Sequence, residues 1–391
     1  MIVKNEAANL PQCLESVASV VDELLIVDTG STDDTVAIAQ QFNARVHQIE
    51  WPNDFAAARN ESLQHVTGDW VLVLDADERL AADVGPQIRQ AIEADRALVV
   101  NLVRQEVGAV QSPYSLVSRL FRRHPDIQFH RPYHALIDDS VEAILQREPQ
   151  WTVQQISEVA ILHEGYQPGA IAQQNKLQRA RLAMERFLVG HPGDPYVCSK
   201  LGALYVQLGR CDAGIDLLER GLKSPDIDPS VRYELHYHLG IAYSRLKHPA
   251  QAAQHYEQAL RQPILAKLKL GAYVNLGSLR QTSQDLAGAR ALYEQAIQID
   301  PGFAIAHYNL GMTFKAAGQL AEALACYLAA LELNPTYAEA YQNLGVVLFK
   351  LGKMPEGVAA FKQAIALHYE QLNPQEAQRL RQGLHDMGFR V

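Results

Sequence analysis

The sequence predicts an α/β domain with a mostly parallel sheet, followed by an all-α solenoid of helical repeats. In the N-terminal part, short apolar runs alternate with segments of helical spacing, which is typical of a sheet covered by helices on both faces. From about Tyr196 onward only helical patterns follow, and the sequence repeats itself. We therefore expect an α/β domain over residues 1–167, a connecting helix over 168–195, five repeats over 196–369 and a capping helix over 370–391.

The apolar runs of the N-terminal part predict four strands. They are ELLIVD, ARVHQIE, DWVLVLD and ALVVNLVR, at residues 23–28, 44–50, 69–75 and 97–104. Between them, segments 31–42 and 54–66 have helical spacing, and each begins with a Ser or an Asp that is suited to an N-cap. Ligands of parallel sheets bind beyond the carboxyl ends of the strands. The polar residues that follow these runs are therefore the candidates for a site.

The C-terminal part repeats with the 34-residue period of tetratricopeptide repeats. Segments 302–335 and 336–369 align without gaps and share glycine at Gly311 and Gly345. Three earlier copies are marked by Gly202, Gly240 and Gly277. Small residues such as Gly311, Ala323 and Ala330 predict the places where two helices of a pair approach closely. Such arrays form a groove for a partner, and a final helix with a polar outer face caps them.

Composition and charge limit the classes of function. The net charge of -9 argues against a nucleic-acid-binding surface, which usually needs clustered basic residues. The four cysteines stand apart without a CxxC pair, which favours a reducing compartment. No apolar run approaches the roughly 18 residues that span a bilayer. We expect a cytoplasmic protein, and peripheral contact with the inner face of the membrane stays open.

Three carboxylates end the strand that is predicted at residues 69–75. The stretch VLVLDADERL places Asp75, Asp77 and Glu78 within four positions. Aspartate favours helix caps and turns, so a solvated turn is one interpretation. The other interpretation is a metal site, because hard oxygen ligands at the carboxyl edge of a sheet suit Mg²⁺ or Mn²⁺ and, through the metal, a diphosphate.

Six segments in order give this stretch a context. They are MIVKNEA, IVDTGSTDDT, DFAAARN, GDWVLVLDADE, SRLFRR and ILHEGY, spread over residues 1–166. With them the N-terminal part resembles the family 2 glycosyltransferases of the GT-A fold, in the branch that is joined to tetratricopeptide repeats. The resemblance implies a nucleotide-sugar-binding domain and metal-dependent transfer of a sugar, with inversion, from a UDP-linked donor. The acceptor would be a protein, a polysaccharide or a lipid-linked sugar, and the repeats would recruit the acceptor or a protein partner.

The resemblance also implies roles for single residues. The donor-binding residues would be Glu6, Asp28, Ser31, Arg59, Asn60 and Asp75. The Mn²⁺ or Mg²⁺ ligands would be Asp75, Asp77 and His163. In addition, Gly30 and Ser31 would make a turn and cap the next helix, and Glu78 would pair with Arg79 to stabilise its turn. Judged by residue type alone, Arg59 would be a surface cation and His163 a structural residue.

The sequence departs from the family pattern at the catalytic base. Related sequences carry a His-Glu pair after the strand that ends in LFR, whereas this chain has His134 followed by Ala135. The candidates for the base are therefore His134, Asp138 and Asp139. A zinc pair of His130 and His134 is disfavoured because a proline separates them in a strand-like segment.

Two functions stay open at this point. Asp28, Asp75 and Asp77 favour an enzyme. Ala135 favours an interaction scaffold that carries a degenerate nucleotide-sugar-binding domain, as does the short first strand, because family members have more residues before MIVKNE. In the repeats, asparagines recur at matching positions, namely Asn275, Asn309 and Asn343. They either bind the backbone of a partner or pack between helices.

Overall fold

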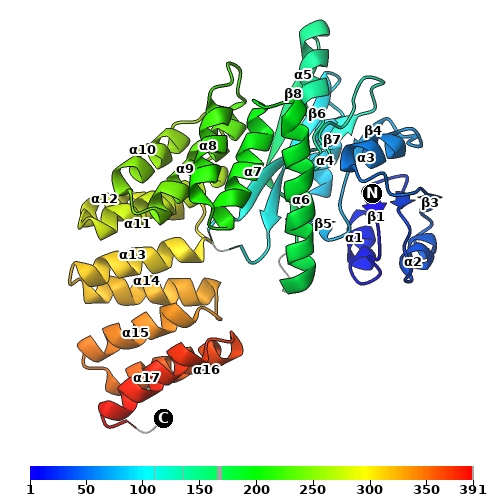
Figure 1. Cartoon of the computed structure of the whole chain (residues 1–391). Helices are drawn as coiled ribbons and strands as arrows, with labels where there is room; N and C mark the ends of the chain where they lie inside the picture. The colour runs from blue at the N-terminus through cyan, green and yellow to red at the C-terminus, as the bar shows by residue number, and fades with distance from the viewer. Residues whose placement is uncertain (110, 134, 165–169, 390–391) are drawn as a thin grey trace. The chain divides into compact units, whose positions relative to one another are not determined.

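The computed structural model describes the backbone of residues 1–109, 111–133, 135–164 and 170–389, and in the last range the side chains from residue 177 onward. The chain divides into two compact units, Met1–Ile227 and Asp228–Val391. The first unit holds two sheets and the helices up to α8, and the second unit holds only helices (Figure 1). The α/β class followed by an all-helical region is thus confirmed.

Two sheets form the α/β part of the first unit. The three-stranded sheet has the order β1 (Ile2–Val3), β2 (Leu25–Asp28) and β3 (Arg45–Gln48), and its strands are parallel. The five-stranded sheet has the order β4 (Trp70–Leu72), β7 (Tyr114–Arg122), β6 (Ala97–Glu106), β8 (Thr152–His163) and β5 (Glu78–Leu80). All four strands predicted from the apolar runs are present, as β2, β3, β4 and β6.

The direction of the strands differs between the two sheets. The prediction of parallel strands holds for the three-stranded sheet, whereas in the five-stranded sheet only β6 and β8 run parallel. The pairs β4–β7, β6–β7 and β5–β8 are antiparallel. Strands β6 and β7 follow one another without a helix between them, and a direct return of the chain makes neighbouring strands antiparallel.

The helices around the sheets follow the expected signals with one exception. They are α1 (Leu10–Val17), α2 (Thr35–Gln41), α3 (Phe55–Leu63), α4 (Gly85–Ile92) and α5 (Asp138–Arg147). The carboxylate of Asp54 caps α3 and accepts a hydrogen bond from Ala57 N at 3.0 Å. The expected cap of α2 by Ser31 is wrong: α2 begins only at Thr35, because the Ser31 hydroxyl accepts a hydrogen bond from Asn5 N instead.

Apolar side chains cover both faces of the five-stranded sheet. On one face, Val100 of β6 lies in a buried cluster that includes Ile88 of α4. On the other face, the neighbouring Val99 lies in a cluster that includes Ile144 of α5. Successive residues of a strand point to opposite faces, so a continuous apolar run such as residues 97–100 serves both cores. This double burial fixes where the strand ends lie.

Three further helices belong to the first unit: α6 (Ala170–Gly190), α7 (Pro195–Gln207) and α8 (Cys211–Leu222). The guanidinium of Arg131 donates to the carboxylate of Asp194 at 2.9 Å, and Asp194 caps α7 by accepting from Val197 N at 2.8 Å. The ring of Tyr133 packs against the apolar cluster of α6 and α7. These contacts attach the first helices after the sheet to the α/β part.

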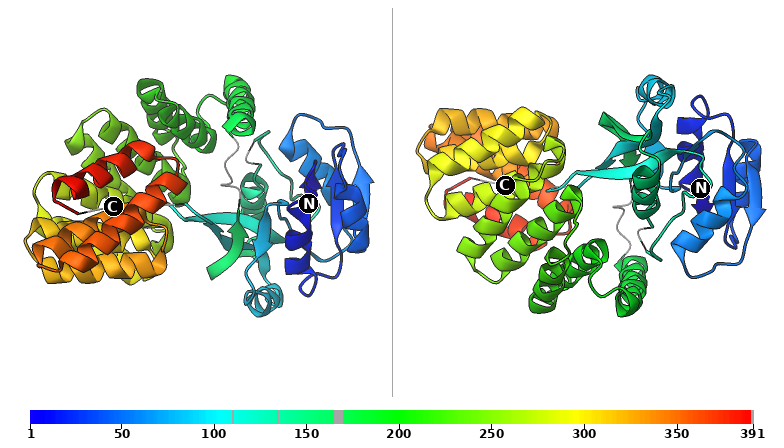
Figure 2. Two further views of the ribbon diagram at one scale, coloured as in Figure 1. Left: turned by 90° about the horizontal axis from the view of Figure 1, so that it is seen from below. Right: turned by 90° about the horizontal axis from the view of Figure 1, so that it is seen from above.

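The second unit is a series of helix pairs. The pairs are α9 (Pro229–Arg245) with α10 (Pro249–Leu260), α11 (Leu270–Thr282) with α12 (Leu286–Ile299), α13 (Ala304–Ala316) with α14 (Leu320–Leu333), and α15 (Ala338–Lys350) with α16 (Met354–Glu370). A last helix, α17 (Pro374–Asp386), packs on α16. Figure 2 shows successive pairs side by side from two directions. Within the described residues, no helix has the length and the apolar character needed to cross a bilayer.

A glycine on the first helix of each pair faces an aromatic ring on the second helix. The glycines are Gly240, Gly277, Gly311 and Gly345, and the rings are those of Tyr256, Tyr293, Tyr327 and Phe361. A Cβ atom at these glycines would lie only 2.4–2.8 Å from a ring carbon. Ala323 and Ala330 of α14 are fully buried. The small residues therefore allow the close approach of paired helices that the repeat pattern predicts.

Candidate functional site

Strands β4 and β5 lie at opposite edges of the five-stranded sheet, and a short segment connects them. The residues between Leu72 and Glu78 therefore pass across the ends of the strands that lie in between. Strands β4, β6 and β8 all end at this edge, since β4 and β6 both run antiparallel to β7. The sheet thus brings Asp75 and Asp77 to the carboxyl edge, as the sequence predicts.

Eight charged or titratable side chains meet at this edge, and we refer to them as the strand-end ion cluster. Its members are Arg59 of α3, Asp75, Asp77, Glu78 of β5, Arg104 and Glu106 of β6, Arg119 of β7 and His163 of β8. They come from five different elements and the β4–β5 connection. The cluster exists only because the sheet collects the ends of these strands.

Asp75 lies between two arginines. Its Oδ1 accepts from Arg59 Nη2 at 2.9 Å, and its Oδ2 accepts from Arg119 Nη2 at 3.0 Å. Burial alone would raise the pKa of Asp75, but the guanidinium groups of Arg119 and Arg59 hold it far below its usual range. The carboxylate is therefore ionised at any physiological pH. Both of its oxygens are already engaged by the protein.

Glu78 is the most buried acid of the cluster, with 1% of its surface exposed. Its carboxylate accepts from Arg104 Nη1 at 2.9 Å and from the backbone N–H of Asp75 at 2.9 Å. The expected pair of Glu78 and Arg79 does not form, since Arg79 pairs with Glu164 at 2.9 Å. Neighbouring residues of β5 point to opposite faces of the sheet, so the two side chains cannot meet.

Asp77, His163 and Glu106 form a row. Asp77 Oδ2 lies 3.2 Å from His163 Nε2, and Glu106 Oε2 lies 2.5 Å from His163 Nδ1. Hydrogen bonds to Asp77 and Glu106 raise the pKa of His163 to about 9, although burial opposes this shift. The imidazole is therefore protonated at neutral pH and links the two carboxylates.

A β-bulge places Arg119 in the cluster. Val100 of β6 pairs with Leu120, whereas Leu102 pairs with Val117, so Ser118 and Arg119 both face the single residue between them on β6. Bulges change the direction of a side chain and are frequent beside functional sites. Here the bulge allows Arg119 to contact two acids, Asp75 at 3.0 Å and Glu78 at 3.5 Å.

Arg59 and Asn60 are used to attach α3 to the following segment. Arg59 is 8% exposed, and besides Asp75 its guanidinium donates to the carbonyl oxygen of Ala135 at 3.1 Å. The amide of Asn60 donates to Phe129 O at 3.0 Å and accepts from Phe129 N at 2.7 Å. Arg59 thus reaches the ion cluster, whereas the Asn60 amide is engaged with backbone.

The other predicted donor-binding residues lie at the ends of β1 and β2. Asp28 is 1% exposed, and its carboxylate accepts from the N–H groups of Gly30 and Ser31 at 3.2 Å. Gly30 has a φ of 95°, which confirms the predicted turn at this residue, because a positive φ favours glycine. Glu6 accepts from the side chain of Asn9 at 2.9 Å. Asp28 therefore shapes the loop that carries Gly30 and Ser31.

The three candidates for the base have different surroundings. His134 lies outside the described residues. Asp138 opens α5 and accepts from Ser118 Oγ at 3.0 Å. Asp139 is bound by Arg131 at 2.6 and 3.1 Å, and Arg131 also binds Asp194. Asp139 thus belongs to the link between α5 and α7.

Sequence reasoning missed two arginines and one acid of the cluster, namely Arg104, Arg119 and Glu106. A signal was present for two of them: Arg104 and Glu106 stand at or near the end of an apolar strand, where a charge has to find an opposite charge. Arg104 and Glu106 also stand two apart on β6, which places them on the same face. Their partners could not be deduced, because these come from strands far away in the sequence.

The metal-binding capacity of the edge can be judged from its donor atoms. Within the described residues, no group of three or more His, Cys, Asp or Glu side chains is arranged to hold a metal ion. Asp77 and His163 offer one oxygen and one nitrogen 3.2 Å apart. Mg²⁺-type sites often use one or two protein ligands together with phosphate oxygens and water. The pair fits a metal that a diphosphate completes once His163 has lost its Nε2 proton, whereas Asp75 is occupied by its arginines.

Comparison with known proteins gives the class of the chain. The Glycosyl transferase family 2 model matches residues 1–153, and tetratricopeptide-repeat models match 199–267, 282–318, 313–352 and 338–368. A TPR repeat-containing protein of Synechococcus elongatus is 44% identical over 301 residues, which cover 77% of this chain and 75% of that protein. The chain therefore belongs to the family in which a family 2 glycosyl transferase domain precedes tetratricopeptide repeats.

Two further matches are more distant. The SPbeta prophage-derived glycosyltransferase SunS of Bacillus subtilis is 25% identical over 231 residues, which cover 57% of this chain and 52% of SunS. The chain thus spans about half the length of this relative. The crystal structure of MamA is matched over 44% of this chain and 96% of its own, with 24% identity and a TM-score of 0.39.

Proposed function

We propose that the chain is a metal-dependent, inverting glycosyltransferase that uses a UDP-linked sugar as donor. The acceptor would be a protein, a polysaccharide or a lipid-linked sugar, and the repeats would recruit the acceptor or a protein partner. The observation that supports this proposal is the strand-end ion cluster, which gathers Asp75, Asp77 and His163 at the carboxyl edge of a sheet in a family 2 glycosyl transferase domain.

In this proposal His163 gives up the proton on Nε2 when a Mn²⁺ or Mg²⁺ ion binds, and Asp77 and His163 then hold the ion together with the donor diphosphate. When bound, such an ion neutralises charge on the leaving nucleotide. Glu106 fixes the ring of His163 through Nδ1, which leaves Nε2 directed at Asp77. Asp75 fixes Arg59 and Arg119 at the same edge, where guanidinium groups suit phosphate oxygens.

Among the described candidates, we assign the role of base to Asp138. Inverting transfer needs a group that takes the proton of the acceptor. Asp138 accepts a hydrogen bond from the hydroxyl of Ser118, whereas Asp139 is held by the guanidinium of Arg131. A carboxylate in such an ion pair is a poorer proton acceptor, because the neighbouring positive charge stabilises its ionised form.

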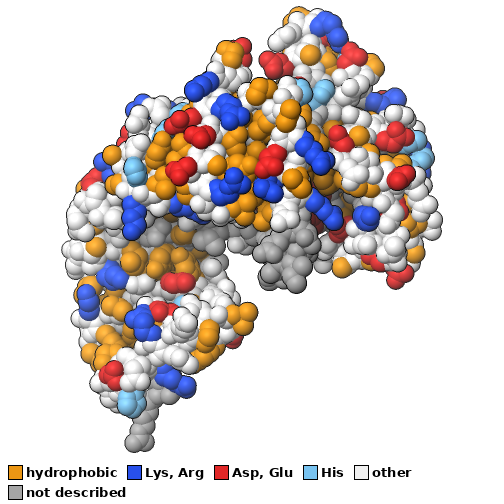
Figure 3. Space-filling view, in the orientation of Figure 1, with side chains coloured by type: hydrophobic (Ala, Val, Ile, Leu, Met, Phe, Trp, Pro, Cys, Tyr) orange, Lys and Arg blue, Asp and Glu red, His pale blue; other side chains and the backbone are white. Residues whose placement is uncertain are grey.

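The proposed cellular setting follows from the cysteines and the surface. All four cysteines are free thiols, which fits a reducing, cytoplasmic compartment. On the face shown in Figure 3, basic and acidic side chains of the described residues are interspersed, without one dominant basic patch. This pattern supports a sugar or protein acceptor over a nucleic acid.

A thermal-shift screen tests the proposal. The full chain is heated with UDP, other nucleotides and nucleotide sugars, with and without Mn²⁺, and the series is repeated with Asp77→Ala. We expect stabilisation by one nucleotide class that depends on Mn²⁺ in the parent and is lost in the variant. Asp83→Ala, an exposed change in the same region, serves as the control and should respond like the parent.

The alternative function is an interaction scaffold with a degenerate donor site. The observation that favours it is Ala135, which stands where related sequences carry a carboxylate and whose carbonyl oxygen accepts a hydrogen bond from Arg59. The scaffold is supported if no nucleotide raises the melting temperature of the parent. It is also supported if the parent binds a nucleotide but does not cleave any nucleotide sugar during prolonged incubation.

A further inference from the structure

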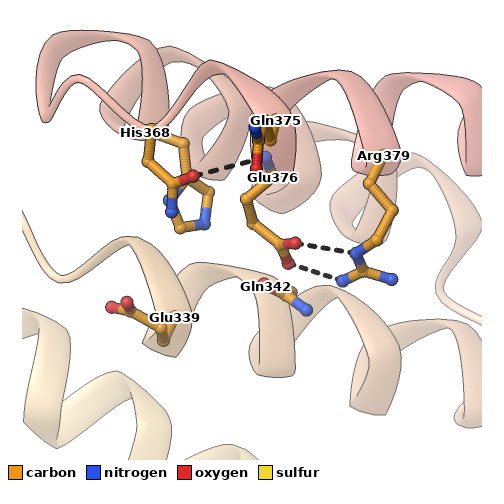
Figure 4. Close-up of a pocket in the computed structure, with 7 residues that line it drawn as sticks. Glu339, Gln342, His368, Gln375, Glu376 and Arg379 are labelled. Atoms are coloured by element: carbon orange, nitrogen blue, oxygen red, sulfur yellow. Dashed lines mark hydrogen bonds and ion pairs between the residues drawn. The ribbon is translucent and has the colours of Figure 1, made fainter.

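The second unit contains a polar cavity beside its last helix. The cavity has a volume of about 420 Å³ and lies between α15, the end of α16 and α17 (Figure 4). It is lined by Glu339, Gln342, His368, Asn373, Gln375, Glu376 and Arg379. All of the seven lining residues are polar, which distinguishes this cavity from the Gly–aromatic contacts that hold the helix pairs together.

His368 is the buried member of the lining. Its side chain is 2% exposed, and its Nε2 has no hydrogen-bond partner among the described residues. A buried polar atom without a partner destabilises the fold, because its lost hydrogen bond to water is not replaced. In Figure 4 the imidazole of His368 and the side chain of Glu376 lie on the same side of the cavity. A ligand that reaches this nitrogen would recover the missing hydrogen bond.

The charges of the lining are unequal. Arg379 donates from Nε and Nη2 to the two oxygens of Glu376, at 2.8 and 2.5 Å. This bond to Arg379 lowers the pKa of Glu376, so this acid is ionised and already paired. Glu339 is exposed, and no cation of the described residues forms an ion pair with it. Two carboxylates and one guanidinium leave the cavity with an excess negative charge.

We propose that this cavity binds the cationic side chain of a lysine or arginine that a partner protein presents. The ammonium or guanidinium would donate to the carboxylate of Glu339 and to Nε2 of His368. An anion is disfavoured because Arg379, the cation of the lining, already donates to Glu376 through two nitrogens. A guanidinium has five N–H donors in a planar fork, which suits the exposed carboxylate of Glu339.

The chemistry of the whole chain agrees with such a partner. The net charge of -9 attracts basic segments over a longer range and accelerates their encounter. Arrays of helix pairs expose their lining residues to extended segments of other proteins. The cavity would then fix one side chain of such a segment and determine its register along α15 and α17.

The test uses the full chain and short peptides of known sequence. The probe is an acetylated and amidated Gly-Ser-Arg-Ser-Gly peptide, and the matched probe carries citrulline, the neutral analogue of arginine, in place of Arg. Binding is followed by the imidazole nitrogen resonances in protein labelled with ¹⁵N-histidine. The signal of His368 is identified by its loss in His368→Gln.

We expect the arginine peptide to shift the His368 signal in a saturable manner and the citrulline peptide to leave it in place. In Glu339→Gln the affinity should fall about tenfold, which corresponds to roughly 1.4 kcal/mol for a charged hydrogen bond. Glu356→Gln changes an exposed acid of α16 outside the lining and should bind like the parent. Both glutamates are exposed, so neither variant should disturb the fold.

Several outcomes would overturn the proposal. Equal shifts by arginine and citrulline peptides would show that charge is not recognised. A shift of His368 by acetylglutamate amide and not by the arginine peptide would assign the cavity to anions. Tighter binding of free spermidine than of the arginine peptide would replace the protein partner by a small polyamine. All measurements omit nucleotide and metal, so their result is independent of the donor-site test.

Discussion

The strand-end ion cluster and the helix pairs are held together by different interactions. In the first unit, Glu78 is 1% exposed and ionised groups surround it, so the edge of the sheet is held by charge. In the second unit, glycines face tyrosine rings, so the helix pairs are held by shape. Buried charges are a costly way to gain stability, because their desolvation offsets most of their attraction. The difference is consistent with the proposed donor site at the cluster, whereas the glycine contacts serve the fold.

The largest effect is expected from Arg119→Met. The change leaves Asp75 and Glu78 with one guanidinium fewer in a region where charges are poorly solvated. Removing one partner of a buried ion pair typically costs about 3–5 kcal/mol. All three tryptophans, Trp51, Trp70 and Trp151, lie in the first unit. Their fluorescence during urea unfolding should therefore show the loss, at a lower midpoint than in the parent.

Arg123→Met is the matched control for this experiment. Arg123 belongs to the same SRLFRR segment but is exposed, and surface substitutions usually stay within about 0.5 kcal/mol. If Arg119→Met and Arg123→Met unfold at the same urea concentration, the cluster contributes nothing to stability. The contrast between a unit held by charge and one held by shape would then be lost.

The second largest effect is expected from Gly311→Ala. The new Cβ would lie 2.8 Å from Cε1 of Tyr327, a ring that is fully buried and cannot move aside. Overpacking of this kind costs about 1–3 kcal/mol. The unfolding transition that is followed by helical circular dichroism should move to a lower urea concentration. The transition that is followed by tryptophan fluorescence should stay in place. Gly383→Ala in α17 meets no atom within 4 Å, and there alanine should stabilise the helix by about 0.5–1 kcal/mol.

Two histidines should give the units opposite responses to pH. Hydrogen bonds to Asp77 and Glu106 raise the pKa of His163 to about 9. Its stabilising effect is fully present below the unfolded pKa of about 6.5 and is lost as the pH rises through 9. Burial and the neighbouring His255 lower the pKa of His236 in α9 to about 4. Its neutral form is favoured, so stability is present above 6.5 and is lost as the pH falls to 4.

Each response is expected to be on the order of 1–2 kcal/mol, because both rings keep some contact with solvent. Urea unfolding is followed by tryptophan fluorescence between pH 6 and 9.5 and by circular dichroism between pH 7 and 4. His163→Gln should flatten the first profile, and His236→Gln should flatten the second. Profiles that keep their slope in these variants would assign the pH dependence to other groups.

The residues that sequence reasoning could and could not find follow the same division. The repeats depend on contacts between neighbours in the chain, so a periodic pattern containing Gly311 was sufficient to predict the helix pairs. The position of Asp75 and Asp77 at the carboxyl edge was also predictable, since a strand carries its own last residues to the edge. Arg119 was not, because its position depends on a bulge between two strands. The partners of Glu78 likewise come from other strands of the sheet.

The smallest effect is expected from Asp139→Asn. Its carboxylate is about half exposed and pairs with Arg131, which keeps Asp194 as a second partner. Exposed pairs contribute about 0–1 kcal/mol, so the unfolding transition should move little. The same variant separates a structural acid from a base. With a donor identified by the thermal-shift screen, Asp139→Asn should release nucleotide at the parental rate, whereas Asp138→Asn should release it at least about 100-fold more slowly. A parental rate in Asp138→Asn and a large loss in Asp139→Asn would reverse the assignment. The base would then be Asp139, in the ion-paired link between α5 and α7.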